Sequence, residues 1–184
     1  MEIDRAVPWM QRTGHRVGEY FVYEVDHFVK DQAEADRLNA MNDGSGFQPW
    51  GKLSPGDVVY KDLNNDGKID DQHDMKAMGY PNTPELQFGI PLGISYKGWD
   101  LSMLFQGAAL TSLQLSGPAV WDFPVMGAQG NNMGKVKSMH LDSWTPDNPD
   151  ASYPALHLGN HPNNNNASSS LFLYNASYLR LKNI

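Results

Sequence analysis

The sequence predicts an all-β protein with antiparallel strands, long loops and one short helix. Two adjoining stretches, residues 86–96 and 99–106, alternate apolar and polar residues with the period of two that a β-strand imposes. A third stretch, residues 18–29, is rich in the aromatic and β-branched residues that strands favour. Only residues 31–41 have a composition typical of a helix. Strands are therefore expected to dominate the structure.

The N-terminal third of the chain divides into a strand, a helix and a loop. We expect a strand over residues 18–29 and a helix over residues 31–41, with Asp31 at its N-cap because a short side-chain oxygen can accept a free N–H of the first turn. Repeated Gly and Pro predict a loop over residues 42–56, since both residues interrupt regular structure. A short strand is expected over residues 58–60.

The alternation over residues 86–106 predicts a hairpin with one apolar face. The apolar positions of its first half are Leu86, Phe88, Ile90, Leu92, Ile94 and Tyr96. Beyond a Lys97-Gly98 turn the alternation continues from Trp99, and only Leu104 breaks it. Such alternation over about ten residues is required of a membrane-spanning barrel strand, but a soluble hairpin with one buried face has it too. Tyr96 and Trp99 at the turn favour a membrane, because aromatic rings gather at its interface.

Composition excludes several classes of protein. The 184 residues carry a net charge of -7, which argues against binding to nucleic acid. The absence of cysteine excludes a disulfide framework and a thiolate metal site. The sequence has no run of about 18 apolar residues, so it predicts no transmembrane helix. No signal peptide is apparent at the N-terminus, so the protein is either cytoplasmic or has its targeting segment upstream.

Residues 107–170 read as a long, loop-rich region, which in a compact domain indicates function or an element that the sequence does not reveal. We expect Trp121, Trp144, Asp147 and Asn148 to be candidate substrate contacts. Aromatic rings stack on sugar rings, and carboxylate and amide groups bind hydroxyls. Ordinary packing of the loops accounts for the same residues, so both interpretations remain.

Residues 62–70 resemble a calcium-binding loop. Asp62, Asn64, Asp66 and Asp70 stand at positions 1, 3, 5 and 9, Lys68 would supply its backbone carbonyl at position 7, and a glycine occupies the bend. His73 stands at position 12, where a bidentate carboxylate belongs, and Asp74 comes one residue later. The alternative is a turn that Asp and Asn side chains close by bonding their own backbone.

Catalytic motifs are missing from the sequence. The six histidines lack zinc-binding spacing, and there is no G-x-S-x-G nucleophile motif. No pair of carboxylates is set apart from the others. We therefore predict that the protein is not an enzyme.

Five segments, in this order, resemble the C-terminal part of the SusC/RagA family of TonB-linked outer-membrane transporters. They are residues 18–23, 54–71, 88–107, the turn at 144–149 and residues 173–184. Together they span nearly the whole chain. The last residues, 174–184, are strand-like and have no closing turn, so we expect residues 1–184 to be part of a single barrel domain that is truncated at both ends.

The resemblance implies a fold, a location and partners. It implies late antiparallel strands and long extracellular loops of a large β-barrel in the bacterial outer membrane, in contact with lipid. It further implies TonB-dependent uptake of oligosaccharides or peptides, with glycans favoured. A SusD-type surface lipoprotein would be the partner, and the TonB complex would act through an N-terminal part outside this chain. The alternative function is a secreted, calcium-stabilised β-module that binds glycans.

The resemblance also gives an orientation. The turn at Lys97-Gly98 would be periplasmic, because outer-membrane barrels have short periplasmic turns and long outer loops. Residues 111–141 and 157–170 would then face outward and contact the substrate or the lipoprotein.

Overall fold

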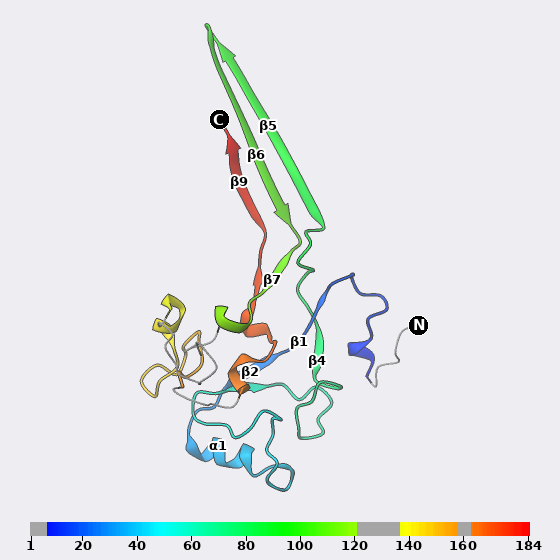
Figure 1. Cartoon of the computed structure of the whole chain (residues 1–184), viewed down its shortest axis with the longest axis vertical. Coiled ribbons are helices and arrows are strands. Elements are labelled where there is room, and N and C mark those ends of the chain that lie inside the picture. Colours follow the sequence, from blue (N-terminus) through cyan, green and yellow to red (C-terminus); the bar gives the residue numbers. More distant parts are fainter. Residues whose placement is uncertain (1–6, 121–136, 158–162) are drawn as a thin grey trace, which may run out of the picture.

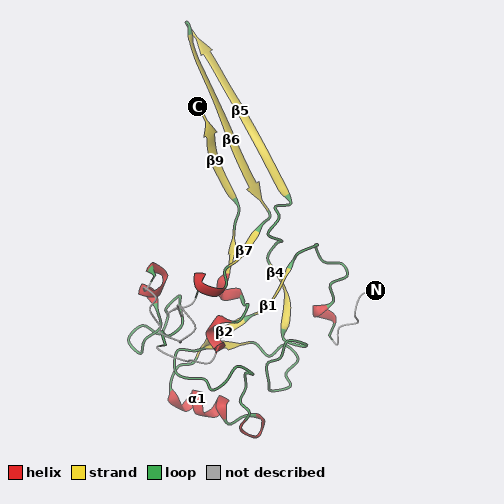
Figure 2. Ribbon diagram, in the orientation of Figure 1, coloured by secondary structure: helices red, strands yellow, loops and turns green. Residues whose placement is uncertain are grey.

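The computed structural model describes residues 7–120, 137–157 and 163–184. A long three-stranded sheet extends from a body of short strands, short helices and loops (Figure 1). Figure 2 shows that the body holds the helices and most of the loops. Among the described residues, no helix is long and apolar enough to cross a membrane.

The projecting sheet consists of β5 (Leu86–Tyr96), β6 (Trp99–Ala109) and β9 (Tyr178–Asn183) in the order β5-β6-β9, with both pairs antiparallel. The predicted hairpin is confirmed, and its register runs without a shift from Tyr96 opposite Trp99 to Leu86 opposite Ala109. Lys97 and Gly98 both have positive φ, 45° and 83°. This is the left-handed conformation that a two-residue hairpin turn requires, because it matches the twist of the strands.

The two faces of this sheet differ sharply in polarity. One face carries the apolar side chains of β5, their partners Trp99, Leu101, Met103 and Phe105 on β6, and Leu179 and Leu181 on β9. The opposite face carries the polar and small residues, among them Gln87, Gly93, Ser102 and Gln106. Every residue of β5 is exposed. The described body therefore leaves the apolar face of β5 uncovered.

A ring covers a glycine on the apolar face. Gly107 lies opposite Phe88, and a Cβ atom at Gly107 would overlap the Phe88 ring. The ring therefore occupies the space that a side chain would need, and it shields the glycine backbone between the strands.

The body contains four short strands: β1 (Tyr20–Tyr23), β2 (Val25–Phe28), β3 (Val58–Tyr60) and β4 (Met75–Met78). The predicted strand over 18–29 is divided at Glu24, since β1 pairs with β4 and β2 pairs with β3. Glu24 accepts hydrogen bonds from Lys76 (2.5 Å) and Lys61 (3.0 Å), which lower its pKa. The sequence did not indicate β4, which lacks β-branched residues and is a strand because β1 pairs with it.

Helix α1 (Gln32–Asn39) begins as predicted, because the Asp31 carboxylate accepts the Glu34 N–H at 2.9 Å. Ala35 and Leu38 are its buried residues, and they pack in the main core with Val58, Tyr60 and their neighbours. Burial raises the pKa of Tyr23 in this core to about 12.

Further elements follow in the second half of the chain. They are β7 (Ser112–Gln114), which pairs with β8 (Leu173–Asn175), and several short 3-10 helices. The 3-10 helices are η1 (Pro8–Met10), η2 (Asn42–Gly44), η3 (Gly117–Ala119), η4 (Ser138–Asp142), η5 (Asn163–Asn166) and η6 (Ser170–Phe172). The loop-rich region therefore includes regular elements that the sequence did not indicate. A second core forms around Val120, Tyr153 and Phe172, where the Tyr153 hydroxyl donates to the Val120 carbonyl.

A buried carboxylate joins the distant parts of the body. Asp57 is fully buried and accepts hydrogen bonds from the side chain of Asn165 (2.9 Å) and the N–H of Ser54 (2.8 Å). His157 Nε2 lies 2.7 Å from the same carboxylate. Asn165 also accepts the Val58 N–H at 2.8 Å, so the segment at 54–58 is tied to segments that follow it by about a hundred residues.

We expect Gly56→Ala to destabilise the body far more than Gly14→Ala. Both glycines have positive φ (84° and 89°), which an alanine adopts with strain. A Cβ atom at Gly56 would also overlap the Trp144 indole and lie 2.5 Å from Ala155 Cβ, whereas one at Gly14 meets nothing within 4 Å. The overlap should cost about 1–3 kcal/mol beyond the shared strain. Urea unfolding of the detergent-solubilised protein measures the difference, and equal losses in the two variants would contradict the packing.

Candidate functional site

The calcium-like loop is closed by its own side chains. The Asp62 carboxylate accepts the Gly67 N–H at 2.7 Å, and the Asp66 carboxylate accepts the Lys68 N–H at 3.1 Å. Asn64 donates its amide to Asp66 at 3.0 Å. These contacts are those of a turn built from Asp and Asn, the alternative that the sequence left open. They do not prevent metal binding, since a carboxylate has lone pairs beyond those used here.

Asp74, and not His73, closes the end of this loop. The buried Asp74 carboxylate accepts the Leu63 N–H and the Asp70 N–H, both at 2.8 Å, and thereby bridges the start and the end of the loop. Burial raises the pKa of Asp74 although these backbone bonds oppose the shift. The extra residue before Asp74 is therefore accommodated with a carboxylate at the closing position.

His73 instead pairs with Asp70. Its Nδ1 lies 2.8 Å from one Asp70 oxygen and 2.9 Å from the other. Burial alone would raise the pKa of Asp70, but the hydrogen bonds from His73 and from the Gln72 N–H outweigh burial and lower it. Asp66, Asp70 and His73 place ligand atoms within 4.8 Å of one another. The Lys68 ammonium lies 3.5 Å from Asp70, so a cation would have to displace it.

Two contacts with the preceding segment, one of them in the core, hold the loop in place. The Ile69 N–H donates to the Phe47 carbonyl at 2.9 Å, and Ile69 is buried in the main core. Asn42 donates its side-chain amide to the Gly67 carbonyl at 2.9 Å. The loop backbone is therefore preorganised, which favours ligand binding because less freedom is lost when a ligand binds.

The predicted substrate contacts differ in their placement. Trp144 is buried against Gly56, which accounts for it as a packing residue. Asp147 is exposed at the tip of the turn, and Asn148 donates to Asp142 at 3.0 Å. Trp121 lies outside the described residues. The exposed Asp147 is therefore the member of this set whose side chain is best placed for a ligand in the described part.

Asp142 and Ser152 form a polar centre that the sequence did not indicate. The Asp142 carboxylate accepts the Ser152 hydroxyl at 2.6 Å and the Ser152 N–H at 3.0 Å. The hydrogen bonds from Ser152 and then Asn148 lower the pKa of Asp142. The two residues border a hollow of about 500 Å³ together with Tyr153 and Phe172. No spacing motif marks them, because they are brought together by the fold of the loops.

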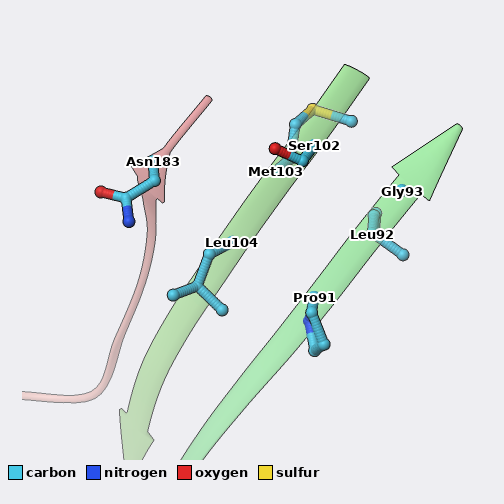
Figure 3. A pocket seen from close by; sticks show the side chains of 7 residues that line it. All are labelled: Pro91, Leu92, Gly93, Ser102, Met103, Leu104 and Asn183. Atoms are coloured by element: carbon cyan, nitrogen blue, oxygen red, sulfur yellow. The ribbon is translucent and has the colours of Figure 1, made fainter. Parts of the chain in front are cut away.

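The polar face of the projecting sheet is also hollowed. A shallow hollow of about 420 Å³ is lined by Pro91, Leu92, Gly93, Ser102, Met103, Leu104 and Asn183 (Figure 3). Pro91, Gly93, Ser102 and Leu104 of this lining belong to the face opposite the apolar one, whereas Leu92 and Met103 belong to the apolar face. The indented surface therefore mixes polar, small and apolar residues.

Comparison with known proteins places these features in a family context. No family model matches the chain. It is 25% identical over 173 residues to TonB-dependent receptor P3 of Formosa agariphila, and 30% identical over 130 residues to TonB-dependent receptor P26 of the same bacterium. These matches cover 94% and 70% of the chain, but the chain spans only 15% and 12% of these relatives' length.

A solved structure has the same fold. The RagAB peptide importer in its open-open state superposes with a TM-score of 0.52 over 89% of the chain, at 20% identity and over 15% of the importer chain. At this identity the likeness shows the fold alone. The sequence-based resemblance and the expected barrel-strand fold are both confirmed by these relatives.

We expect calcium at millimolar concentration to stabilise this loop. Asp62→Asn and Asp66→Asn should remove the effect, because each takes away a charged oxygen ligand, while Asp43→Asn, an exposed change outside the loop, should retain it. Isothermal titration of the detergent-solubilised protein, with melting measured in parallel, provides the test. Absence of both binding heat and a melting shift in the unsubstituted protein would identify the loop as a turn without metal.

Proposed function

Because this chain is a SusC/RagA-like stretch of a TonB-dependent receptor of the bacterial outer membrane, we propose that its projecting sheet forms part of a barrel wall and that the barrel imports a nutrient. Residues 1–184 would then belong to a single barrel domain of which they supply one part. The proposal extends to this chain the uptake activity that the names of its relatives indicate.

The observation that carries the proposal is the two-faced sheet. Strands β5 and β6 have 11 residues each, and a tilted barrel strand needs about 9–11 to cross a bilayer. Their apolar side chains form one continuous face, while polar and small residues form the other. Ile94 is 61% exposed and Trp99 82% exposed. Lipid on the apolar face would remove this surface from water.

The same observation disfavours a secreted glycan-binding module. A soluble hairpin buries its apolar face against a second layer of structure. The described body lies at the base of the hairpin, away from the turn (Figure 1). The burial of Gly107 and Ala108 comes from pairing with β9 and from the Phe88 ring, so it does not indicate a covering layer. In water, the half of the hairpin next to the Lys97-Gly98 turn would expose its apolar side chains to solvent.

The orientation follows from the position of the body. The turn at Lys97-Gly98 lies at one end of the sheet, and the body lies at the other (Figure 1). We place the turn in the periplasm and the body, with its loops, outside the cell, since long segments of such barrels are extracellular. Tyr96 and Trp99 would then lie at the periplasmic interface, where aromatic side chains are favoured.

The partners and the substrate are part of the proposal. We place a SusD-type surface lipoprotein against the outward-facing body and assign energy coupling to a TonB complex, through a part of the receptor outside this chain. As substrate we propose an oligosaccharide, which the family resemblance favours, or a peptide, which is what the solved relative is described as importing. Exposed Asp147 and the Asp142–Ser152 hollow would supply substrate contacts from the loops.

We expect Leu92→Lys to prevent assembly and Gly93→Lys to permit it. The two positions are neighbours at the same depth, but they lie on opposite faces, with Leu92 on the apolar face. A lysine facing lipid near the bilayer midplane should cost about 2–4 kcal/mol, and one facing the lumen far less. A Cβ atom added at Gly93 meets nothing within 4 Å. The amount of folded receptor in outer membranes, read from its heat-dependent shift in gel mobility, distinguishes the variants, and equal assembly would refute the lipid assignment.

The transport function itself is tested in the source bacterium. Uptake of labelled oligosaccharides and peptides should fall to background when the receptor gene is deleted and when the TonB complex is inactivated. The receptor should fractionate with the outer membrane in both wild-type cells and cells without TonB. Uptake that persists without TonB, or a receptor found in the soluble fraction, would overturn the proposal.

A further inference from the structure

Two cations on the polar face of the sheet have no acidic partner among the described residues. Arg180 donates to the Gln106 side chain at 3.3 Å, and its guanidinium lies 5.5 Å from the centre of the Tyr178 ring. Lys182 borders a hollow of about 340 Å³ together with Gln87 and Gln106. Within residues 7–120, 137–157 and 163–184, no ion pair includes either cation.

The strand register brings these groups to one face. Arg180 is opposite Gln106, which is itself opposite Gly89 on the polar side. The register between β6 and β9 then shifts by one residue, with Phe105 opposite Leu181 but Leu104 opposite Asn183. Such a bulge redirects a side chain. As a result Asn183 contributes to the polar face in addition to Lys182.

Small residues make room beside the cations. Gly89 and Gly93 have no side chains, and a Cβ atom at either would meet nothing closer than 3.8 Å. The hollow at Lys182 and the hollow in Figure 3 share Leu104, so the two adjoin along the face. The result is a shallow trough, here called the cationic trough, which Lys182 lines and beside which Arg180 is held by Gln106.

The charge of this trough differs from that of the chain. The chain as a whole has a net charge of -7. On the polar face of strands β5, β6 and β9, however, the acidic residue is Asp100, which lies towards the turn and accepts a hydrogen bond from Ser95 at 2.5 Å. Several residues of β6 separate Asp100 from Gln106, at about 3.4 Å a residue. An anion at the trough would therefore meet two cations, and Glu85, the carboxylate just before β5, is already paired with Arg16 at 2.5 Å.

We propose that the cationic trough binds a carboxylate group of the imported substrate. A guanidinium and an ammonium give charge-assisted hydrogen bonds to a carboxylate, and the amides of Gln87 and Gln106 can donate to the same group. Acidic oligosaccharides and acidic peptides share this chemistry. The inference rests on the proposed function, because it places the polar face in the lumen of the transporter.

The test measures ligand binding to the receptor in isolated outer membranes. The probes are a short oligogalacturonate and a short glutamate peptide, with a neutral glucose oligomer and a glutamine peptide for comparison. The double variant Arg180→Gln, Lys182→Gln should bind the acidic probe about tenfold more weakly and the neutral probe unchanged. Lys97→Gln, which removes a cation at the turn, is the matched control and should leave binding unchanged. Whichever acidic probe responds identifies the source of the carboxylate.

Two outcomes overturn the inference. Equal binding of acidic probes by the unsubstituted and the double-variant receptors would remove any role for the two cations in recognition. The second outcome combines two results: the double variant is not found folded in the membrane, and the single variant Lys182→Gln keeps the preference for acidic over neutral probes. Together they would show that the cations serve assembly and not recognition. Binding is read without energised transport, so a receptor that binds the acidic probes but does not import them would refute the proposed function, while the carboxylate-binding role of Arg180 and Lys182 would still be supported.

Discussion

The whole arrangement depends on the pairing of β5 with β6. Their register fixes which side chains share a face, because a slip of one residue would move every side chain to the opposite side. The two-residue turn at Lys97-Gly98 fixes that register from one end, and the Phe88 ring over Gly107 marks it near the other. The apolar face, the polar face and the place of β9 beside β6 all follow from this register.

The body depends on a different kind of interaction, in which a few buried polar groups replace extensive sheet pairing. Its two-stranded sheets are too small to be stable alone, since isolated two-stranded sheets are marginal in water. The fully buried Asp57 connects Ser54, His157 and Asn165, and Trp144 packs beside it against Gly56. Buried polar groups are costly unless they are fully bonded, so this centre specifies one arrangement of the loops.

Sequence reasoning succeeded where a local pattern decides the structure. The hairpin, the Asp31 cap and the strand at Val58–Tyr60 are local, and each is found within a few residues of its expected place. It failed where pairing with a distant segment decides the structure, as for Met75–Met78, which becomes a strand by pairing with β1. The same limit applies to the sites. The spacing of Asp62–Asp70 was visible, whereas the closing role of Asp74 and the Asp142–Ser152 contact depend on the folded loop. The burial of Trp144 likewise depends on a glycine distant in sequence.

Pro91 leaves one backbone hydrogen-bond donor missing from the unpaired edge of β5. Pairs in an antiparallel ladder alternate between bonded and non-bonded, and a two-residue turn makes its closing pair, Tyr96–Trp99, a bonded one. Pro91 and Leu104 are therefore a non-bonded pair, so the backbone of Pro91 is directed to the open edge, where proline has no N–H to donate. Any strand that extends the sheet beyond β5 must leave one carbonyl without a partner from β5 at this level. That carbonyl lies in the middle of the strand, where only water from the polar side or a bulge in the neighbouring strand can satisfy it.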